Sequence, residues 1–182
     1  MISRPAARTA LACLAVIEGA AALRRHARRG EQYAAARAHS QRTGRPLLVV
    51  GDPDAGLHTA LYRAYGCGDV CVDLADCPKC PRSHGVDLCA DKIPLPNNGA
   101  IVFVGCTLEY VPAMEPAWRE LLRVSGGPDA IYMATVQPWC LTAWLYPGAR
   151  RLVHECGAAR EIRATEKAAL VGALGYLAYA AI

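Results

Sequence analysis

The residues best suited to chemistry begin with a glycine-containing turn behind an apolar run. Residues 46–50 read Pro-Leu-Leu-Val-Val, residues 51–56 form a turn that begins and ends with glycine, and residues 57–65 favour a helix. A strand that passes through a glycine turn into a helix is typical of nucleotide sites, because the N–H groups exposed there bind phosphates or carboxylates. Asp73 ends the next apolar segment. It lies about twenty residues beyond the turn, where such folds place the acid that binds ribose hydroxyls.

A second candidate site is a loop that contains Cys77, Cys80, His84 and Cys89. Thiolate and imidazole groups are zinc ligands, and the Cys-x-x-Cys pair has the spacing of a zinc knuckle. Cys67 and Cys71 are further candidate ligands, although the mid-strand position of Cys71 favours packing as a small apolar residue. A second Cys-x-x-Cys pair is missing, so unligated thiols are favoured over a bound zinc ion. The pair lies between prolines and opens no helix, which argues against a thioredoxin-like role.

The cysteines and the N-terminal segment also bear on the compartment. The chain has nine cysteines, an odd number. The apolar stretch at residues 10–23 is followed by a cluster of arginines, whereas a cleavable secretory signal carries its charges before the apolar run. We therefore expect reduced thiols and a cytoplasmic protein, with attachment to the cytoplasmic face of a membrane as an open alternative.

A pattern of alternating strands and helices must position these residues. Short apolar runs predict strands at residues 46–50, 69–74, 100–106 and 130–136, and an amphipathic helix is expected at residues 115–124. This alternation predicts an α/β fold, a Rossmann-like, mostly parallel sheet flanked by helices. No convincing pair of later strands follows, so we expect the C-terminal part of the sheet to be truncated.

Taken together, residues 46–136 resemble the class I S-adenosylmethionine-dependent methyltransferases of the small-molecule (type 11) group. The resemblance rests on the glycine turn, on Asp73 and on the acidic stretch before residues 93–95. It also rests on Leu-Glu-Tyr-Val-Pro at residues 108–112, which is similar to the family's Leu-Glu-His-Val motif. The resemblance implies methyl transfer from S-adenosylmethionine to an unknown acceptor.

The resemblance implies roles for the turn and for the acid that follows it. Gly51 and Gly56 would form the turn around the methionine part of the cofactor. Asp52 and Asp54 would either put negative charge near its carboxylate or bind its ammonium group instead, and Asp73 would bind the ribose hydroxyls. One carboxylate can accept from both vicinal hydroxyls, which suits this position.

The resemblance also implies the walls of the site. Asp87 or Asp91 would lie near the adenine, and residues 106–110, among them Cys106, Glu109 and Tyr110, would line the reaction pocket. Enzymes of this kind mainly align an acceptor with an already activated methyl group. No fixed set of catalytic residues is therefore implied.

Three departures from the family pattern concern the same motifs. Val50 stands where the family usually has an acid, Pro53 removes a backbone donor from the turn, and Tyr110 replaces the histidine of the motif. They keep open an alternative to the enzyme. In that alternative the chain is a catalytically inactive methyltransferase-like domain that serves as a structural or membrane-associated interaction module.

The chain divides into three segments by composition. Residues 1–45 form a basic helical arm, residues 46–150 a methyltransferase-like Rossmann domain, and residues 151–182 an apolar C-terminal helix. Residues 1–46 carry nine Arg against two Glu, a net charge of +7, whereas the remainder carries a net −3. Good helix formers dominate the arm, which predicts one or two helices that end at residues 43–44.

Two apolar segments suggest contact with a membrane surface, through residues 10–29 and residues 168–182. The apolar part of the first segment, residues 10–23, has fourteen residues and the second segment has fifteen, and both are shorter than the roughly 20 apolar residues that cross a bilayer. Membrane contact of the first segment, at the interface or as a short inserted span, is one alternative, and packing of Leu11, Leu14, Ile17 and Leu23 on the domain is the other. No aromatic residues are interleaved with the arginines, so specific nucleic-acid binding is not expected. Homo-oligomerisation stays open.

Overall fold

The computed structural model of the chain describes residues 4–55 and 63–135. These residues include the N-terminal arm and the α/β core behind it. The predictions for Gly56, for most of the helix at residues 57–65, for the truncated end of the sheet and for the apolar segment at residues 168–182 lie outside the described residues.

The centre of the fold is a five-stranded sheet in which every pair of neighbouring strands is parallel. The strands are β1 (Leu47–Val50), β2 (Val70–Asp73), β3 (Ser83–Gly85), β4 (Ile101–Gly105) and β5 (Ile131–Ala134), in the order β3-β2-β1-β4-β5. The prediction of an α/β fold with a parallel sheet is confirmed. Four of the five strands lie where the apolar runs predicted them.

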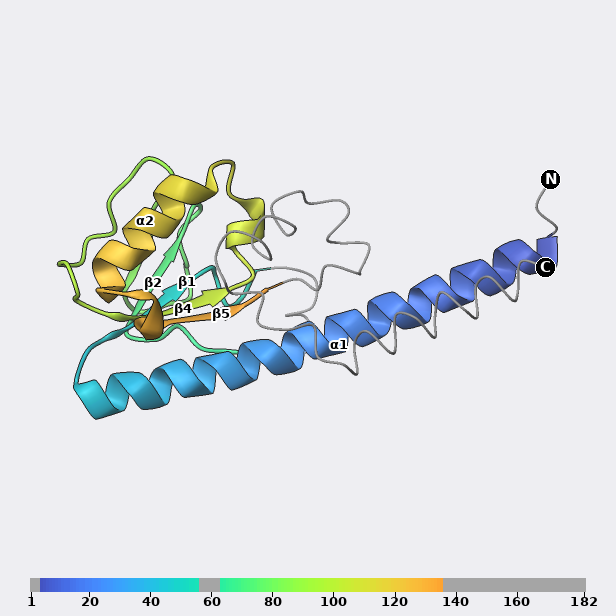
Figure 1. Cartoon of the computed structure of the whole chain (residues 1–182), viewed down its shortest axis with the longest axis horizontal. Coiled ribbons are helices and arrows are strands. Elements are labelled where there is room, and N and C mark those ends of the chain that lie inside the picture. Colours follow the sequence, from blue (N-terminus) through green and yellow to red (C-terminus); the bar gives the residue numbers. More distant parts are fainter. Residues whose placement is uncertain (1–3, 56–62, 136–182) are drawn as a thin grey trace.

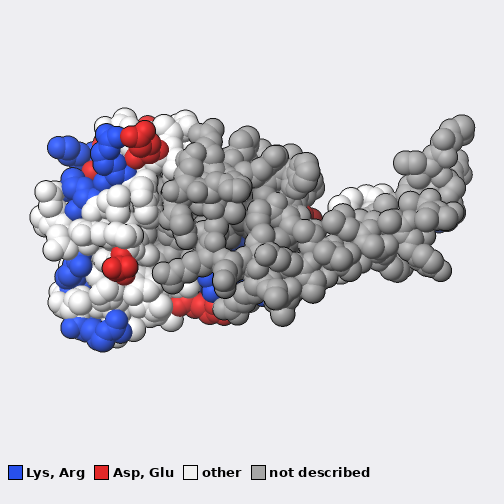
Figure 2. Space-filling view, viewed as in Figure 1, with Lys and Arg blue, Asp and Glu red and all other residues white. Residues whose placement is uncertain are grey.

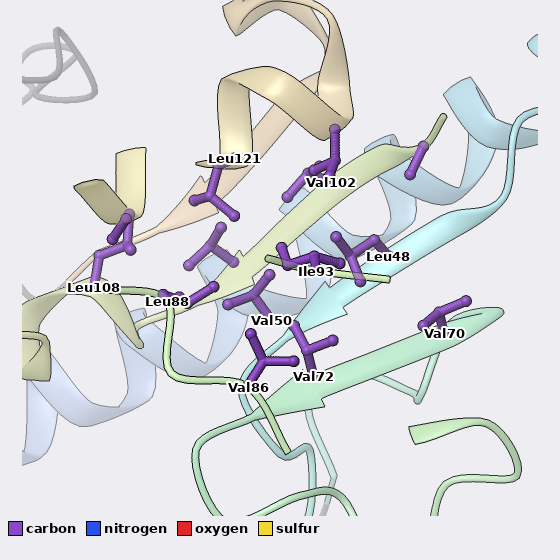
Figure 3. Packing of buried hydrophobic residues seen from close by; sticks show 14 of the residues in the cluster. Leu48, Val50, Val70, Val72, Val86, Leu88, Ile93, Val102, Leu108 and Leu121 are labelled. Carbon is purple, nitrogen blue, oxygen red and sulfur yellow. The ribbon is translucent and has the colours of Figure 1, made fainter. Parts of the chain in front are cut away.

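The two central strands are apolar at every position because both of their faces are covered. β1 and β4 are buried along their whole length. Successive side chains point to opposite faces of a strand. Leu48 and Val50 therefore join one core cluster, and Leu47 and Val49 join the other. Figure 3 shows the first cluster, in which Leu48, Val50 and Val102 lie side by side on adjacent strands.

Helix α2 (Met114–Ser125) covers the first face of the sheet. It buries Ala117, Leu121 and Val124 in the same core cluster, and Figure 3 shows Leu121 pointing toward the sheet. The helix ends at Gly126, whose φ of 75° is left-handed and whose N–H donates to the Leu122 carbonyl. Glycine adopts this conformation without the steric cost of a Cβ, which is why the helix stops there.

Helix α1 (Arg4–Thr43) is a single helix of 40 residues. It ends where the composition of the arm predicted. Its C-terminal half lies along the second face of the sheet, where Ala36 is buried and the rings of Tyr33 and Phe103 pack edge to face at 5.5 Å. The arm is thus continuous with the core of the α/β domain.

The N-terminal half of α1 extends beyond the sheet (Figure 1). Packing of Leu11, Leu14 and Leu23 on the domain was one of the two alternatives for this segment. That alternative is wrong for these three side chains, which are 68%, 47% and 70% exposed. They belong to the part of the helix that extends past the edge of the sheet. Within the described residues, no helix combines the length and apolarity of a membrane span.

Candidate cofactor-binding site

A cavity of about 390 Å³ lies at the carboxyl ends of three neighbouring strands. Val50, Asp73 and Gly105 are the last residues of β1, β2 and β4, and all three line it. The carboxyl ends of adjacent parallel strands meet at one edge of a sheet, so residues far apart in the sequence come together there. The volume falls within the range of roughly 300–1,000 Å³ that small-molecule sites occupy.

Gly51 shapes the floor of the cavity. Its φ of 101° is left-handed, and an added Cβ would lie 2.2 Å from the Thr107 hydroxyl oxygen. The Gly51 N–H donates to the Val72 carbonyl at 2.9 Å, and the Thr107 hydroxyl donates to the Val50 carbonyl at 3.1 Å. The turn after β1 is therefore held between β2 and the segment after β4. Only glycine fits between them.

Asp73 joins the turn to the end of β2. One carboxylate oxygen accepts from the Asp52 N–H at 2.9 Å, and the other accepts from the Ala75 N–H at 3.3 Å. An ionised carboxylate has about four lone-pair positions, so two bonds leave capacity for two further donors. Asp73 is only partly buried and lines the cavity, where such donors can reach it.

Six of the ten residues implied by the family resemblance line the cavity. They are Gly51, Asp52, Asp73, Asp87, Cys106 and Tyr110. Gly56 lies outside the described residues. Among the described residues, Asp54, Asp91 and Glu109 are not part of the lining.

Each of these three acids has another place. Asp54 pairs with the guanidinium of Arg63, and this hydrogen bond lowers the pKa of its carboxyl. Asp91 accepts the N–H of Asp87 at 3.0 Å and so holds the loop that carries Asp87. Glu109 is buried in the short 3-10 helix η2 (Leu108–Tyr110) that follows β4.

Thr107 belongs to residues 106–110, which were predicted to line the reaction pocket, and it lines the cavity. Tyr65 and Arg29 also line the cavity but were not predicted. Tyr65 places its hydroxyl 3.5 Å from the Gly51 carbonyl oxygen, and burial raises its pKa. Arg29 reaches the cavity from α1 and is 8% exposed. No sequence pattern connects an arginine of the basic arm with a site formed mainly by residues 50–112.

Cys106 occupies a strained position at the carboxyl end of β4. Its φ of 61° is left-handed, which is uncommon for residues other than glycine and occurs often at functional sites. The thiol is free and buried. Burial, together with the negative charge of Glu109, raises its pKa to about 12. The side chain is thus a neutral thiol at physiological pH, which suits a wall of the cavity better than a nucleophile.

No family model, curated protein or solved structure matches this chain. The cavity is lined by the acidic residues Asp52 and Asp73 and by Arg29 from α1. Val86, Leu88 and other apolar side chains also line it. This combination suits a small ligand that has both polar and apolar parts.

The cysteine-rich loop differs from the prediction of reduced thiols. Cys67 forms a disulfide with Cys80, and Cys71 forms one with Cys77. The prediction is wrong for these four residues because the chain between β2 and β3 folds back on β2 and brings their sulfur atoms together. Cys71 is buried within β2, as its position predicted.

The structure regroups the predicted zinc ligands. Sulfur atoms of Cys71, Cys77 and Cys80 lie within 4.8 Å of one another, and all three residues are buried. His84 and Cys89 do not belong to this group. His84 lies on β3, and the Cys89 thiol donates to the Ala113 carbonyl at 3.2 Å on the other side of the fold.

Proposed function

We propose that the described α/β domain is Rossmann-like and binds S-adenosylmethionine in this cavity. The chain then transfers the methyl group of this cofactor to an acceptor. The strand order β3-β2-β1-β4-β5 supports the Rossmann-like assignment, because the chain moves outward from β1 in one direction and then returns to continue in the other. Helices α1 and α2 cover the two faces. Ligands of open α/β sheets bind outside the carboxyl ends of the strands at such a reversal point, and the cavity lies there.

One observation carries the proposal: the Asp73 carboxylate lies next to the Gly51 turn and retains acceptor capacity toward the cavity. The vicinal hydroxyls of a ribose are the donors that an ionised carboxylate accepts best, because hydrogen bonds to a charged partner are the stronger ones. A nucleoside whose ribose hydroxyls bind Asp73 would extend along the cavity toward the Gly51 turn.

The other walls fit the two ends of the same cofactor. Asp87 and the apolar Leu88 would flank the adenine, and Asp52 would attract the ammonium group of the methionine part. Cys106, Thr107 and Tyr110 would then surround the methyl group. Since the sulfonium already activates this methyl group, the protein has to align the acceptor and exclude water.

Isothermal titration calorimetry with S-adenosylmethionine and S-adenosylhomocysteine tests this function. We expect both to bind with a 1:1 stoichiometry, because they share the nucleoside that Asp73 would hold. Adenosine alone should bind more weakly, and methionine alone should compete poorly. Absence of heat with both cofactors in the millimolar range would refute the proposal.

A second candidate is the membrane-associated module, and the exposed N-terminal half of α1 favours it. Leu11, Val16 and Leu23 are each at least 68% exposed on a helix that belongs to the segment of net charge +7. Apolar side chains with flanking arginines are the features that bind anionic lipid surfaces. On the α/β domain, in contrast, basic and acidic side chains are interspersed over the described part of the face in Figure 2.

Vesicle flotation distinguishes this candidate. The full chain should float with vesicles that contain anionic lipid and less with neutral ones. Replacement of Leu11, Leu14 and Leu23 by serine should abolish flotation. The matched control is Leu74→Ser, which removes an equally exposed leucine from the α/β domain and should leave flotation unchanged. Equal flotation of both variants would exclude α1 as the membrane contact.

A further inference from the structure

Three cysteine sulfur atoms lie close together between β2 and the segment that follows it, and a fourth cysteine is bonded to one of them. Cys71, Cys77 and Cys80 bring their sulfur atoms within 4.8 Å of one another. Cys67 completes the group through its bond to the Cys80 sulfur. We call these four residues the cysteine cluster. It lies on the α1 side of the sheet, in the core group that contains Leu47 and Val49.

The pairing of the disulfides shows that the convergence involves all four residues. In the sequence the cysteines form two short pairs, Cys67-x-x-x-Cys71 and Cys77-x-x-Cys80. The disulfides do not follow these pairs, since each joins one member of the first to one member of the second. Such crossed pairing requires both short pairs to face each other. Two facing Cys pairs with two to four intervening residues are the ligand arrangement of structural zinc sites.

The dimensions also fit a single metal ion. Tetrahedral zinc with Zn–S bonds of about 2.3 Å places its sulfur ligands about 3.8 Å apart. The sulfur atoms of Cys71, Cys77 and Cys80 already lie within 4.8 Å of one another, so they need to shift only slightly to reach this spacing once the disulfides are open. The Cys67 sulfur, now bonded to that of Cys80, would have to move toward the other two. Cys71 and Cys77 are fully buried and Cys80 nearly so, which matches the closed coordination of structural zinc.

Backbone hydrogen bonds hold the cluster independently of the disulfides. The Cys71 N–H donates to the Arg82 carbonyl at 2.9 Å, and the Cys80 N–H donates to the Cys77 carbonyl at 2.9 Å. The Cys77 N–H donates to a carboxylate oxygen of Asp76 at 2.7 Å. None of these bonds involves a sulfur atom, so reduction of the disulfides removes none of them directly.

We propose that the cysteine cluster is a redox-dependent tetrathiolate zinc site. A dithiol reductant transfers two electrons and two protons to each disulfide, which yields four thiols and converts two equivalents of the dithiol to its cyclic disulfide. Zn²⁺ then binds four thiolates and releases four protons. In the reverse direction, two equivalents of a small-molecule disulfide such as oxidised glutathione accept four electrons from the four thiolates and, with four protons from solvent, become four thiols; the two disulfides of the chain form again and Zn²⁺ is released.

The cysteine cluster adjoins the cofactor cavity. The exchange of disulfides for bound zinc therefore takes place next to the turn that forms the cavity floor. The Cys71 sulfur lies 3.9 Å from the Gly51 carbonyl oxygen. Gly51 is the residue that shapes the cavity floor. A shift of the Cys71 sulfur from a disulfide to a metal therefore occurs in van der Waals contact with the turn. The zinc site itself does not depend on which ligand the cavity binds.

Metal binding by the full chain tests the proposal. The protein is reduced with dithiothreitol, exchanged into reductant-free buffer under argon, and titrated with Zn²⁺ against a chromophoric chelator. We expect one tightly bound Zn²⁺ per reduced chain and none per oxidised chain. Co²⁺ should give the charge-transfer and ligand-field absorption of four thiolates around a tetrahedral ion. A reduced chain that binds no Zn²⁺ would overturn the proposal.

Variants assign the ligands. Cys67→Ser and Cys80→Ser should each weaken Zn²⁺ binding by more than the ~100-fold that loss of an outer-shell contact causes. His84→Ala and Cys89→Ser replace the ligand types outside the cluster and should leave the affinity unchanged. If these two control variants lose Zn²⁺ while the cluster variants retain it, the assignment is wrong.

Alkylation of the wild-type chain gives a readout that does not depend on how the variants fold. Bound Zn²⁺ should protect all four cluster cysteines of the reduced chain from iodoacetamide, as measured by peptide mass spectrometry. Cys89, which is outside the cluster, should be alkylated equally with and without the metal. Protection of Cys89 together with free alkylation of Cys67 would overturn the proposed ligand set.

Discussion

The Asp73 carboxylate accepts a hydrogen bond of 2.9 Å from the backbone N–H of Asp52. This bond connects the carboxyl end of β2 with the turn after β1, two places that are 21 residues apart in the chain. Because the acceptor is ionised, the bond is stronger than one between neutral groups. Asp73 therefore positions the turn and, with its remaining lone pairs, offers an acceptor to the cavity.

Substitution of Asp73 should separate these two roles. Asp73→Asn retains one oxygen that can accept the Asp52 N–H, whereas Asp73→Ala retains none. Loss of a hydrogen bond to a charged group corresponds to about 1.5–3 kcal/mol. We expect both variants to bind S-adenosylhomocysteine roughly 10- to 100-fold more weakly by calorimetry, and only Asp73→Ala to lower the urea midpoint of unfolding.

Asp69→Ala is the matched control for Asp73. It removes another carboxylate that accepts a backbone N–H, that of Leu47 at 2.7 Å, but one outside the cavity lining. The affinity of this variant for S-adenosylhomocysteine should stay within about threefold of the wild-type value, a difference in binding free energy of less than about 1 kcal/mol. Equal affinities of the wild type and Asp73→Ala would place the ribose elsewhere.

Gly51→Ala should destabilise the fold because of both its backbone angle and its surroundings. A Cβ at this position would lie 2.2 Å from the Thr107 hydroxyl oxygen. We expect a loss of about 2–4 kcal/mol in the free energy of unfolding, from strain of the left-handed conformation and the clash together. Gly44→Ala is the control, since Gly44 also has a positive φ of 68° but no atom within 4 Å of the added Cβ.

The Gly44 control should lose only about 1 kcal/mol of unfolding free energy, the cost of the backbone angle alone.

The clash between the added Cβ and Thr107 can be removed separately. In the Thr107→Ala background, Gly51→Ala should cost less than it does in the wild type. If the two costs are equal in a double-mutant cycle measured by urea denaturation, Thr107 is not the group that excludes a side chain at Gly51.

Glu120 should contribute to the pH dependence of stability. Its carboxylate accepts the Ile93 N–H at 2.7 Å and pairs with Arg123, whose guanidinium donates to the Ile93 carbonyl at 2.9 Å. Burial opposes ionisation of Glu120, but the hydrogen bonds from Arg123 and Ile93 outweigh it and hold its pKa below the ordinary 4.5. The carboxylate therefore stabilises the fold above pH 4.5, and this contribution is lost as the pH falls from there through the lower pKa of the folded state.

The corresponding measurement is the urea midpoint of unfolding between neutral and acidic pH. Glu120→Ala should lose about 2–3 kcal/mol at neutral pH and little at the acidic end, because three hydrogen bonds to a charged group disappear, one from Ile93 and two from Arg123. Glu115→Gln is the control, since the Glu115–Arg119 pair on the same helix is exposed. It should change stability by less than about 0.5 kcal/mol at any pH. If the urea midpoints of the two variants changed with pH in the same way, the role of Glu120 would be contradicted.

Cys106 should resist alkylation in the folded chain. Burial raises the pKa of its thiol to about 12 from the ordinary 9.0, which reduces the thiolate population near neutral pH by about a factor of a thousand. Iodoacetamide at pH 8 should therefore label the partly exposed Cys13 and Cys89 long before Cys106, as mass spectrometry of time points would show. All three should react at similar rates in urea. Rapid labelling of Cys106 in the folded chain would mean that its thiolate is accessible.

The core of the sheet was predictable because its sequence signal is strong. β1 and β4 are buried on both faces, so they appear as continuous apolar runs at residues 47–50 and 101–105. The boundaries of α2 followed from its amphipathic period and from Gly126. β3 was not predicted. It is a three-residue edge strand with partly exposed polar side chains, and only its pairing with β2 makes it a strand.

The candidate site was predictable only in part. Gly51 and Asp73 stand in a local strand–turn–helix pattern, and the resemblance to a family supplied Asp87, Cys106 and Tyr110. Arg29 carries no such signal, because its approach to the cavity depends on how α1 lies across the sheet. Asp54 and Asp91 looked equivalent to Asp52 and Asp87 by type, yet their side chains are engaged with Arg63 and with the Asp87 backbone.

The fold class, the central strands and the position of the turn after β1 followed from local sequence patterns, because periodic burial and glycine conformation are local properties of the chain. Which side chains meet depends instead on the path of the folded chain. Parallel strands bring Val50, Asp73 and Gly105 to one edge, and the return of the chain after β2 brings Cys67 and Cys71 to Cys77 and Cys80. Contacts of this kind depend on strand order and crossover path, which no local pattern of residues specifies.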